Sequence, residues 1–462
     1  MINENIFRAY DIRGKAVEDL NDEIIRKIGI VLSEKILKTG QNKVYLGTDC
    51  RLSANRIKKS LISGLCSNDL EVLDLGMVPT PLVYFATKIG KTNCGIMITG
   101  SHNPKEDNGL KMVINDGAVS GFEIKNDVIN LKNKTTNIVN ISDARDLIKQ
   151  YENEIFSNCK LAKKIKVVLD SGNGAAGPYA KKVFEKIGAE VISLNTEPDG
   201  NFPNHHPDPS KEKNLKDLIE SVSVNKADLG FAFDGDGDRV GMVDNNSNIV
   251  SPDHIIMLLS EYFLQKKKGP VIYDVKCSMN VEKAILAAGG RPMMAKTGHS
   301  FMKRVLAANP DALMAAEMSG HIFMADRGWY GFDCSLYNAA RIIELWSRTD
   351  GLSFSGELNR LAPNLPTTGE VKIPCLEENK LNTVEAIMHA FSDYESSTID
   401  GVRVRFNNDE GDQIGWYLAR KSNTEPILVM RVEATSEQEL SDLLALIHQR
   451  VSPIINISKL LE

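Results

Sequence analysis

The sequence contains no apolar run of the roughly 20 residues needed to span a bilayer, which argues against a membrane protein. Basic residues do not predominate: 55 Lys and Arg face 61 Asp and Glu, for a formal charge of −6. A general binder of nucleic acid or of membrane surfaces would need a basic face, so we expect neither partner. The N-terminal stretch MINENIFRAYDIRG lacks a basic segment followed by an apolar one, so we expect no secretory signal.

Cysteine is scarce, with seven residues scattered along the chain and no CxxC pair. That distribution argues against a disulfide framework and against a zinc site, and it fits reduced thiols in a cytoplasmic protein. The 462 residues are long enough for three or four domains, and the hydrophobic content of 42% is ordinary for a water-soluble globular chain.

One pattern recurs three times along the chain. A strand rich in β-branched residues ends at an Asp, then follow a small or polar loop, an amphipathic helix and a second apolar strand. The three strand-ending residues are Asp49, Asp170 and Asp274. Strand–helix–strand units of this kind favour parallel pairing, with helices packed on the sheet.

Each repeat is followed by a further short apolar strand and an unusual polar loop. The three segments read CGIMITGSHNP, ADLGFAFDGDGDR and DALMAAEMSGH. Because ligands gather at the carboxyl ends of strands in α/β sheets, three related domains would each offer one loop to a common cleft.

The pattern changes after Pro363, where strands, a turn-rich break, further strands and a closing helix indicate a smaller α+β domain. We therefore predict an α/β protein with three related mixed-sheet α/β domains and a C-terminal α+β domain around a central cleft. The predicted boundaries are 1–150, 151–253, 254–365 and 366–462.

The loop DGDGDR alternates Asp234, Asp236 and Asp238 with glycines. Three carboxylates held this close would repel one another, and a divalent cation relieves the repulsion; hard carboxylate oxygens suit Mg²⁺. An EF-hand fails on spacing, since Arg239 and Asn245 stand where that loop needs Gly and Glu. A solvated acidic turn is the alternative.

The loop TGSHNP, read alone, is equally compatible with an ordinary turn, since Gly, Ser, Asn and Pro all favour turns. A metal held by three carboxylates keeps positions free for phosphate oxygens, as in phosphoryl-transfer sites. Ser101 then becomes a candidate phosphoryl acceptor, with His102 and Lys111 to complement the charge of a phosphoserine.

The remaining candidates come from five segments. Glu317, Ser319 and His321 form a plausible set for sugar hydroxyls, or a capped helix start. Arg420 lies beside several hydroxyl and amide donors in RKSNTEP, which suits a phosphate but also describes a polar turn. The other donors and charged groups of these segments are Ser422, Asn423, Thr424, Arg13, Tyr10, Lys276 and His299.

A competing motif is GNGAAG, residues 172–177, which satisfies GxGxxG after a strand and before a helix. Glu197 lies about 20 residues beyond, as a dinucleotide site requires. This alternative, a nucleotide-cofactor oxidoreductase, leaves the other loops unexplained and sets Asp170 against the glycines, where it would repel a pyrophosphate.

Taken together, these segments resemble the α-D-phosphohexomutases over essentially the whole chain. TGSHNP resembles their phosphoserine loop, DGDGDR their metal loop, AEMSGH their sugar loop and RKSNTEP their phosphate loop. Ala316 departs from the Gly that usually opens the sugar motif. FRAYDIRG and Met318 are most similar to bacterial phosphomannomutase/phosphoglucomutase; a phosphoglucosamine mutase of the same fold is the alternative.

The resemblance implies reversible transfer of phosphate between C1 and C6 of mannose, and of glucose as well, through a phosphoserine and a hexose 1,6-bisphosphate. It implies Ser101, Asp234, Asp236 and Asp238 as ligands of Mg²⁺, and the bisphosphate as activator. Charge near the transferring group would be neutralised by Lys111, His102, Arg13 and Arg239, with His299 as acid or base. The substrate would be bound by Tyr10, Lys276, Glu317, Ser319, His321, Arg420, Ser422, Asn423 and Thr424. We expect a monomer or weak homodimer acting on small sugar phosphates.

Overall fold

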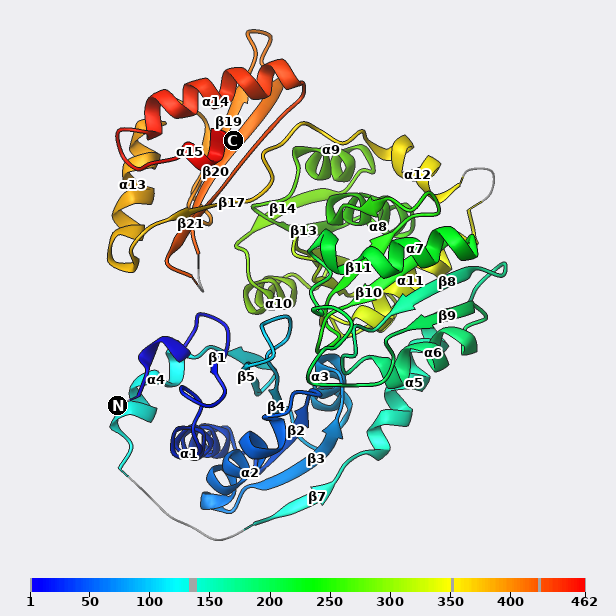
Figure 1. Cartoon of the computed structure of the whole chain (residues 1–462), viewed down its shortest axis with the longest axis vertical. Coiled ribbons are helices and arrows are strands. Elements are labelled where there is room, and N and C mark those ends of the chain that lie inside the picture. The colour runs from blue at the N-terminus through cyan, green and yellow to red at the C-terminus, as the bar shows by residue number, and fades with distance from the viewer. Residues whose placement is uncertain (1, 133–138, 350–352, 423–424, 462) are drawn as a thin grey trace. The chain divides into compact units, whose positions relative to one another are not determined.

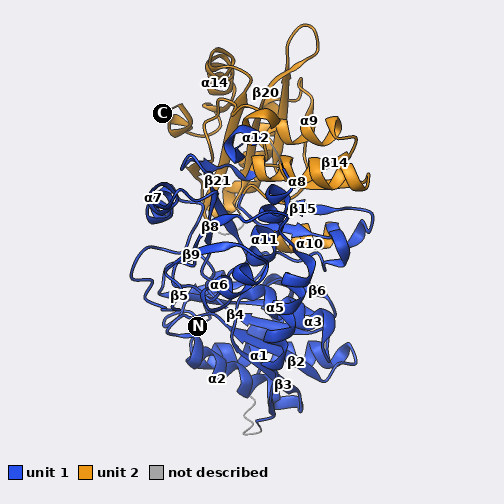
Figure 2. Ribbon diagram, turned by 90° about the vertical axis from the view of Figure 1, so that its right-hand side faces the viewer, with its two compact units in different colours: residues 1–252, 306–315, 319–357 blue, residues 253–305, 316–318, 358–462 orange. Residues whose placement is uncertain are grey.

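The computed structural model of the chain describes residues 2–132, 139–349, 353–422 and 425–461. The chain divides into two units, coloured separately in Figure 2. Unit 1 holds residues 1–252, 306–315 and 319–357, and unit 2 holds residues 253–305, 316–318 and 358–462.

The first sheet, in unit 1, has seven strands and is mixed (Figure 1). The strand order is β1-β5-β4-β2-β3-β7, and β6 pairs with β5. Strand β2 runs parallel to β3 and β4, whereas β5 is antiparallel to β4, β1 and β6. The strands are β1 (Ile12–Lys15), β2 (Lys43–Thr48), β3 (Glu71–Met77), β4 (Gly95–Ile98), β5 (Asp107–Ile114), β6 (Gly117–Val119) and β7 (Ile141–Asp143).

The helices of this first part are α1 (Asp22–Lys38), α2 (Ala54–Leu65), α3 (Thr80–Ile89), α4 (Phe122–Asn130) and α5 (Asp146–Asn158). Helix α1 is capped by Asn21, whose side chain accepts a hydrogen bond from the Ile24 amide at 3.1 Å. Acidic residues in its first turn and lysines in its last turn complement the helix dipole.

The second sheet, also in unit 1, has five strands in the order β12-β11-β10-β8-β9. Strand β8 is parallel to β9 and β10, and β11 is antiparallel to β10. The elements are β8 (Lys166–Asp170), α6 (Gly177–Lys186), β9 (Glu190–Leu194), α7 (Lys216–Asn225), β10 (Leu229–Phe233), β11 (Val240–Val243) and β12 (Ile249–Val250).

The third α/β segment includes β13 and β14, which pair in parallel within unit 2. Its helices are α8 (Pro252–Lys266), α9 (Met279–Ala287), α10 (His299–Ala308), α11 (Ser335–Ser347) and α12 (Phe354–Leu361). Its strands are β13 (Pro270–Asp274), β14 (Arg291–Ala295), β15 (Met314–Ala316) and β16 (Ile322–Met324).

The C-terminal part of unit 2 is an antiparallel sheet in the order β17-β21-β20-β19-β18, on which α13 and α14 pack (Figure 1). Ile387 of α13 and Ile447 of α14 are buried against Tyr417 and Met430 of the sheet. The elements are β17 (Val371–Pro374), α13 (Lys380–Ala390), β18 (Ser396–Ser397), β19 (Val402–Asn407), β20 (Gln413–Lys421), β21 (Ile427–Ala434), α14 (Glu437–Val451) and α15 (Ser458–Leu461).

Short 3-10 turns lie between these elements at η1 (Glu4–Ile6), η2 (Cys66–Asn68), η3 (Glu212–Asn214), η4 (Asp326–Gly328) and η5 (Glu377–Asn379). Within the described ranges, no helix combines the length and the apolar character that crossing a membrane requires.

Helices α1 and α2 cross with almost no space between their backbones, because each presents a glycine at the crossing. A Cβ on Gly29 would lie 2.6 Å from the Leu61 carbonyl oxygen, and one on Gly64 would lie 2.9 Å from Gly29 Cα and still closer to the Arg26 carbonyl. Since interiors are packed at crystal-like density, neither helix can absorb a methyl group without moving.

We therefore expect Gly64→Ala to lower the free energy of unfolding by about 1–3 kcal/mol, the usual cost of overpacking. Urea unfolding followed by circular dichroism measures the change. Gly117→Ala is the matched control, because its Cβ would meet nothing closer than 3.4 Å. Equal stability of the two variants would contradict the close crossing.

Candidate active site

Ser101 lies three residues beyond β4, in a loop with unusual backbone geometry. The φ angle of Ser101 is 47°, in the left-handed region that side-chain-bearing residues seldom adopt. Its amide donates to the Thr99 hydroxyl at 2.7 Å, and the residue is only 3% exposed. A strained, buried serine of this kind needs its surroundings to hold it in place.

Arg51 provides much of that support. Its guanidinium donates to the backbone carbonyls of four loop residues, at distances between 2.6 and 2.9 Å. Those four residues are Ser101, Asn103, Pro104 and Asp107. The loop is thus wrapped around one buried cation, which satisfies carbonyls that no helix or sheet would pair.

Asp49, at the end of β2, fixes the other side of the same loop. Its carboxylate accepts hydrogen bonds from the Thr99 hydroxyl at 2.7 Å, from the Gly100 amide at 3.2 Å and from Arg51 Nε at 3.2 Å. Gly100 is required here, because a Cβ at this position would lie 2.7 Å from Arg51 Nη1.

Residues of the second α/β segment also contact this loop, within unit 1. The Arg51 guanidinium lies 5.4 Å from the centroid of the Phe202 ring, a cation–π contact. His206 Nε2 donates to the His102 carbonyl at 2.6 Å. The serine loop is therefore held by two sheets and not by one.

The three-Asp loop lies directly against Ser101. Ser101 Oγ donates to Asp234 Oδ2 at 3.0 Å and lies 3.2 Å from His102 Nδ1. A Cβ on Gly235 would lie 2.6 Å from the Ser101 carbonyl oxygen, so this glycine is what allows the two loops to approach.

Asp234, Asp236 and Asp238 are completely buried and offer oxygens that all lie within 4.8 Å of one another. Burial, with the negative charges of Asp238 and Asp236, raises the pKa of Asp234 to about 7. Oδ1 of Asp236 and Oδ1 of Asp238 have no hydrogen-bond partner among the described residues. Buried carboxylate oxygens without a partner are costly, and a cation would satisfy them.

Lys111, on β5, supplies the nearest positive charge. Its Nζ lies 2.6 Å from Asp236 Oδ2 and is also paired with Asp238. Burial opposes the ammonium charge, but the two carboxylates outweigh it and raise the pKa of Lys111 well above its usual value. The Thr80 amide at the start of α3 donates to the Asp236 carbonyl at 2.8 Å.

Two of the arginines named from the sequence lie beside these loops. Arg13 Nη1 donates to the Gly100 carbonyl at 2.5 Å, and Arg239 Nε donates to Asp234 Oδ2 at 3.1 Å. Burial, and then the charges of Arg239 and Arg13, hold the pKa of His102 well below its usual value, so the imidazole is neutral. Tyr10 lies in the half-buried loop before β1.

His321 lies beside the three-Asp loop, although the sequence places it on a different loop. Its Nδ1 is 2.9 Å from Asp333 Oδ2 and 3.8 Å from Asp238 Oδ1. Asp333 fixes the orientation of this ring, since a carboxylate on one ring nitrogen sets the tautomer of the other.

The glycine-rich motif 172–177 packs against the three-Asp loop. The Ala175 amide donates to the Gly235 carbonyl at 3.0 Å, and a Cβ on Gly174 would lie 2.9 Å from the same oxygen. Asp170 accepts hydrogen bonds from the Gly172 amide at 2.9 Å and from His205 at 2.8 Å. The glycines thus serve packing between loops, and their amides face protein groups.

Unit 2 contains Glu317, His299 and Lys276. Glu317 is buried and accepts a hydrogen bond from the Gly298 amide, next to His299 at the start of α10. Lys276 Nζ is 3.1 Å from Glu370 and 3.9 Å from Asp274. Burial opposes its charge, but Asp274, Glu370 and Glu317 raise the pKa of Lys276.

The segment RKSNTEP is described only in part. Arg420 Nε donates to Asp400 Oδ2 at 2.8 Å, and the buried Ser422 hydroxyl accepts from the Glu425 amide at 3.1 Å. Asn423 and Thr424 lie outside the described residues. Ser319, in the loop before β16, belongs to unit 1.

Four residues that organise these loops were not predicted from the sequence as parts of the site: Arg51, Thr80, Asp333 and His206. Arg51 and Thr80 carry no signal in the sequence, since Arg51 lies in an ordinary loop after β2 and Thr80 is an ordinary first residue of α3. Asp333 and His206 are polar residues in loops between predicted elements, and such positions would have been reasonable to examine.

Comparison with known proteins agrees with this arrangement. Models of the phosphoglucomutase/phosphomannomutase family match four consecutive parts of the chain: alpha/beta/alpha domain I at residues 4–138, domain II at 146–247, domain III at 251–364 and the C-terminal domain at 370–449. A Pseudomonas putida phosphomannomutase/phosphoglucomutase is 43% identical over 444 residues, which cover 95% of this chain and 93% of the relative. A Neisseria meningitidis serogroup A phosphoglucomutase is 39% identical over 446 residues, 94% of each chain.

A crystal structure of a phosphoglucomutase/phosphomannomutase family protein from Burkholderia thailandensis superposes with a TM-score of 0.88 at 38% identity, and the match covers 99% of both chains. The chain therefore belongs to the phosphoglucomutase/phosphomannomutase family, whose members are isomerase-type phosphotransferases. Family members use a metal ion, and the three-Asp loop is a group of carboxylates that could hold one. The predicted family, fold class and enzyme class are confirmed.

We expect Arg51→Lys to lower turnover by about a hundredfold, the scale of loss when a reacting group is misplaced by an ångström. A lysine has one nitrogen and cannot hold four carbonyls in a plane as the guanidinium does. Steady-state kinetics on glucose 1-phosphate measures the effect.

Arg56→Lys is the matched control, because Arg56 also donates to backbone carbonyls, among them that of Leu20 at 3.0 Å, but away from Ser101. Similar losses in both variants would show that Arg51 has no particular role at the serine loop.

Proposed function

We propose that this enzyme interconverts the 1-phosphate and 6-phosphate of mannose and of glucose, with Ser101 as the phosphorylated residue. The single observation that carries the proposal is the contact of Ser101 Oγ with Asp234 at 3.0 Å, inside a buried cluster of three carboxylates. A serine hydroxyl beside such a cluster has one evident chemical use, which is to carry a group that the cluster's cation stabilises.

In the first half of the proposed reaction, the bond between phosphorus and Ser101 Oγ breaks as a free hydroxyl oxygen of the hexose phosphate bonds to phosphorus. The hydroxyl proton passes to a base, a role we give to His299. The product is a hexose 1,6-bisphosphate. In the second half, the intermediate has turned round and its other phosphoryl group returns to Ser101 Oγ. Added hexose 1,6-bisphosphate acts as the activator because it phosphorylates Ser101.

We assign Mg²⁺ to Asp234, Asp236 and Asp238, with a phosphoserine oxygen on Ser101 as a further ligand. The unpartnered Oδ1 atoms of Asp236 and Asp238 and the raised pKa of Asp234 support the fit, since hard oxygens suit this ion. When bound, Mg²⁺ neutralises charge on the phosphoryl group in transfer.

Four side chains of unit 1 neutralise the remaining charge or orient the serine. Lys111 and Arg239 contact the carboxylates, and Arg13 contacts the Gly100 carbonyl beside Ser101. His102, neutral and 3.2 Å from Oγ, accepts or donates a hydrogen bond without adding charge. The positive charges of Lys111, Arg239 and Arg13 offset the negative charges of a phosphoserine and of a phosphorylated sugar.

The other predicted residues bind the sugar and its second phosphate. Glu317, Ser319, His321 and Lys276 bind sugar hydroxyls in both orientations. Arg420 and Ser422, with Asn423 and Thr424, hold the phosphate that is not being transferred, and Tyr10 also contacts the substrate. The charged and hydrogen-bonding character of these groups supports the assignment. We place the enzyme in the cytoplasm, as a monomer or weak homodimer acting on small sugar phosphates.

Ser101→Ala should lower turnover by at least about 10³-fold, the scale seen when a nucleophile is removed. The assay measures turnover of mannose 1-phosphate, glucose 1-phosphate and glucosamine 1-phosphate with Mg²⁺ and a trace of hexose 1,6-bisphosphate. Ser60→Ala is the control, because the hydrogen bonds of its hydroxyl within the described part of the chain go to Asp22 and to the Arg56 carbonyl.

Retained activity in Ser101→Ala would disprove the phosphoserine. Preference for glucosamine 1-phosphate would keep the mechanism but make the enzyme a phosphoglucosamine mutase, the alternative within the same fold.

Mg²⁺ should raise the thermal unfolding midpoint of the wild-type chain, because an ion that binds only the folded state stabilises it. Asp236→Asn should lose the shift, whereas Asp217→Asn, an exposed change on α7, should retain it. Differential scanning calorimetry with Mg²⁺ and then a chelator measures both. A shift that persists in Asp236→Asn would place the ion elsewhere.

A further inference from the structure

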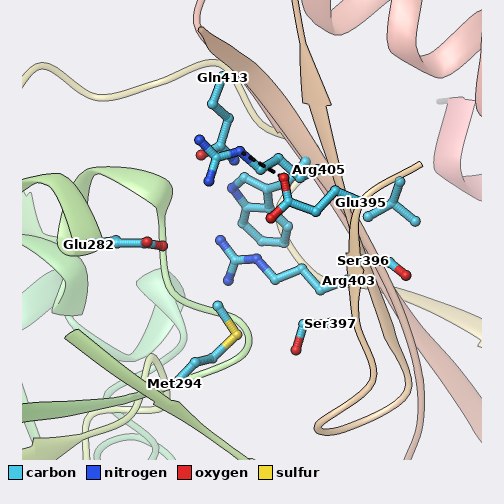
Figure 3. Close-up of a pocket in the computed structure, with 10 residues that line it drawn as sticks. Glu282, Met294, Glu395, Ser396, Ser397, Arg403, Arg405 and Gln413 are labelled. Atoms are coloured by element: carbon cyan, nitrogen blue, oxygen red, sulfur yellow. Dashed lines mark ion pairs between the residues drawn. The ribbon is translucent and has the colours of Figure 1, made fainter. Parts of the chain in front are cut away.

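A pocket of about 170 Å³ lies within unit 2, and none of the residues that line it is among those assigned to the reaction (Figure 3). It is lined by side chains from α9, β14, the edge strand β18 and strands β19 and β20. Its most distinctive feature is a pair of opposite charges, Arg403 and Glu282, that share the pocket without contacting each other.

Arg403 is held in place by groups that leave half of its guanidinium unused. Nη1 donates to the carbonyls of Val275 and Cys277 at 2.6 and 2.9 Å, and the guanidinium lies 3.8 Å from the centroid of the Trp416 ring. Nε and Nη2 have no acceptor among the described residues, and no carboxylate of those residues pairs with the side chain, which is 7% exposed.

A buried cation that lacks an anion is unfavourable, and this one has donors directed at a cavity. Burial lowers the pKa of Arg403, and the negative charge of Glu433 only partly opposes that effect. A ligand carboxylate could take both unused donors at once, because the planar fork of arginine matches that group.

Glu282, on α9, lies on the other side of the pocket. The Tyr273 hydroxyl donates to its Oε2 at 3.2 Å, and Oε1 makes no hydrogen bond with the described residues. Figure 3 shows the Glu282 carboxylate and the Arg403 guanidinium on facing sides. Each side chain has hydrogen-bond partners of its own, and the two do not form an ion pair in this structure.

We propose that this pocket binds a small zwitterion, a free α-amino acid, with its carboxylate on Arg403 and its ammonium on Glu282. A compact molecule with opposite charges a few bonds apart complements two fixed, separated and opposite protein charges. The proposal is independent of the phosphoryl-transfer reaction.

The rest of the lining favours a zwitterion over a phosphate. The pocket's other charges, Arg405 and Glu395, approach to 3.9 Å and offset each other. A phosphate dianion would therefore enter a pocket with two arginines and two glutamates, where the carboxylates repel it. Met294 adds apolar surface for a short side chain, and Ser396 and Ser397 add hydroxyls at the edge strand.

Isothermal titration of the full-length enzyme with glycine, L-alanine, L-serine and L-methionine tests the proposal. We expect one molecule of the preferred amino acid to bind per chain. Propionate, which lacks the ammonium of alanine, and ethylamine, which lacks its carboxylate, should each bind at least about tenfold more weakly than L-alanine.

Two variants separate the two ends of the site. Arg403→Lys should weaken amino-acid binding at least about tenfold, since lysine keeps the charge but loses the fork. Glu282→Gln should do the same while still accepting the Tyr273 hydrogen bond, and it carries the test if the Arg403 variant does not fold. Glu385→Gln, exposed on α13, is the control and should bind like the wild type.

Absence of binding by all four amino acids would overturn the proposal. So would propionate binding as tightly as L-alanine with no effect of Glu282→Gln, which would make the pocket a simple anion site. Saturable binding of inorganic phosphate that displaces the amino acid and is weakened by Arg403→Lys would also overturn the zwitterion assignment.

Discussion

The electrostatic cost of burying three carboxylates in one loop governs the arrangement of unit 1. Asp234, Asp236 and Asp238 are removed from water, and after the pairing with Lys111 two of their oxygens still lack a hydrogen bond from any described residue. Without a compensating cation such a cluster would neutralise itself by taking up a proton, as the raised pKa of Asp234 indicates. The serine loop, the strand that carries Lys111 and the start of α3 all contact this cluster of buried carboxylates.

A second constraint is geometric. Ser101 sits at a backbone angle that costs free energy, and the chain recovers that cost through Arg51 and Asp49, which bind the loop's carbonyls, an amide and a hydroxyl. Gly100 and Gly235 allow this conformation because they have no side chain. A side chain on either would occupy space already filled by Arg51 or by the Ser101 carbonyl. A loop composed of turn-forming residues therefore has a single, tightly specified conformation.

Much of the fold was predictable because a strand can be identified from the local sequence alone. The short apolar strands expected before TGSHNP and DGDGDR are β4 and β10. The closeness of the three Asp residues followed from their spacing. The role of Arg51 did not, because one arginine after a strand looks like any other until the fold brings residues 101–107 to it. The motif GNGAAG suggested a nucleotide site for a related reason. Its glycines allow close packing against another loop of the protein, and the spacing of glycines alone does not show whether they pack against a loop or against a phosphate.

The serine loop is also a joint property of two domains. Arg51 and Asp49 come from the first sheet, whereas Phe202 and His206 reach it from the second, and the second sheet also supplies Asp234 and Gly235. When domains are exchanged among relatives, the domains of the first and second sheets should therefore be transferred together. The same reasoning bears on how such proteins diversify: substitutions that tune the loop's chemistry have to be compatible with both sheets at once, which leaves the other domains freer to change.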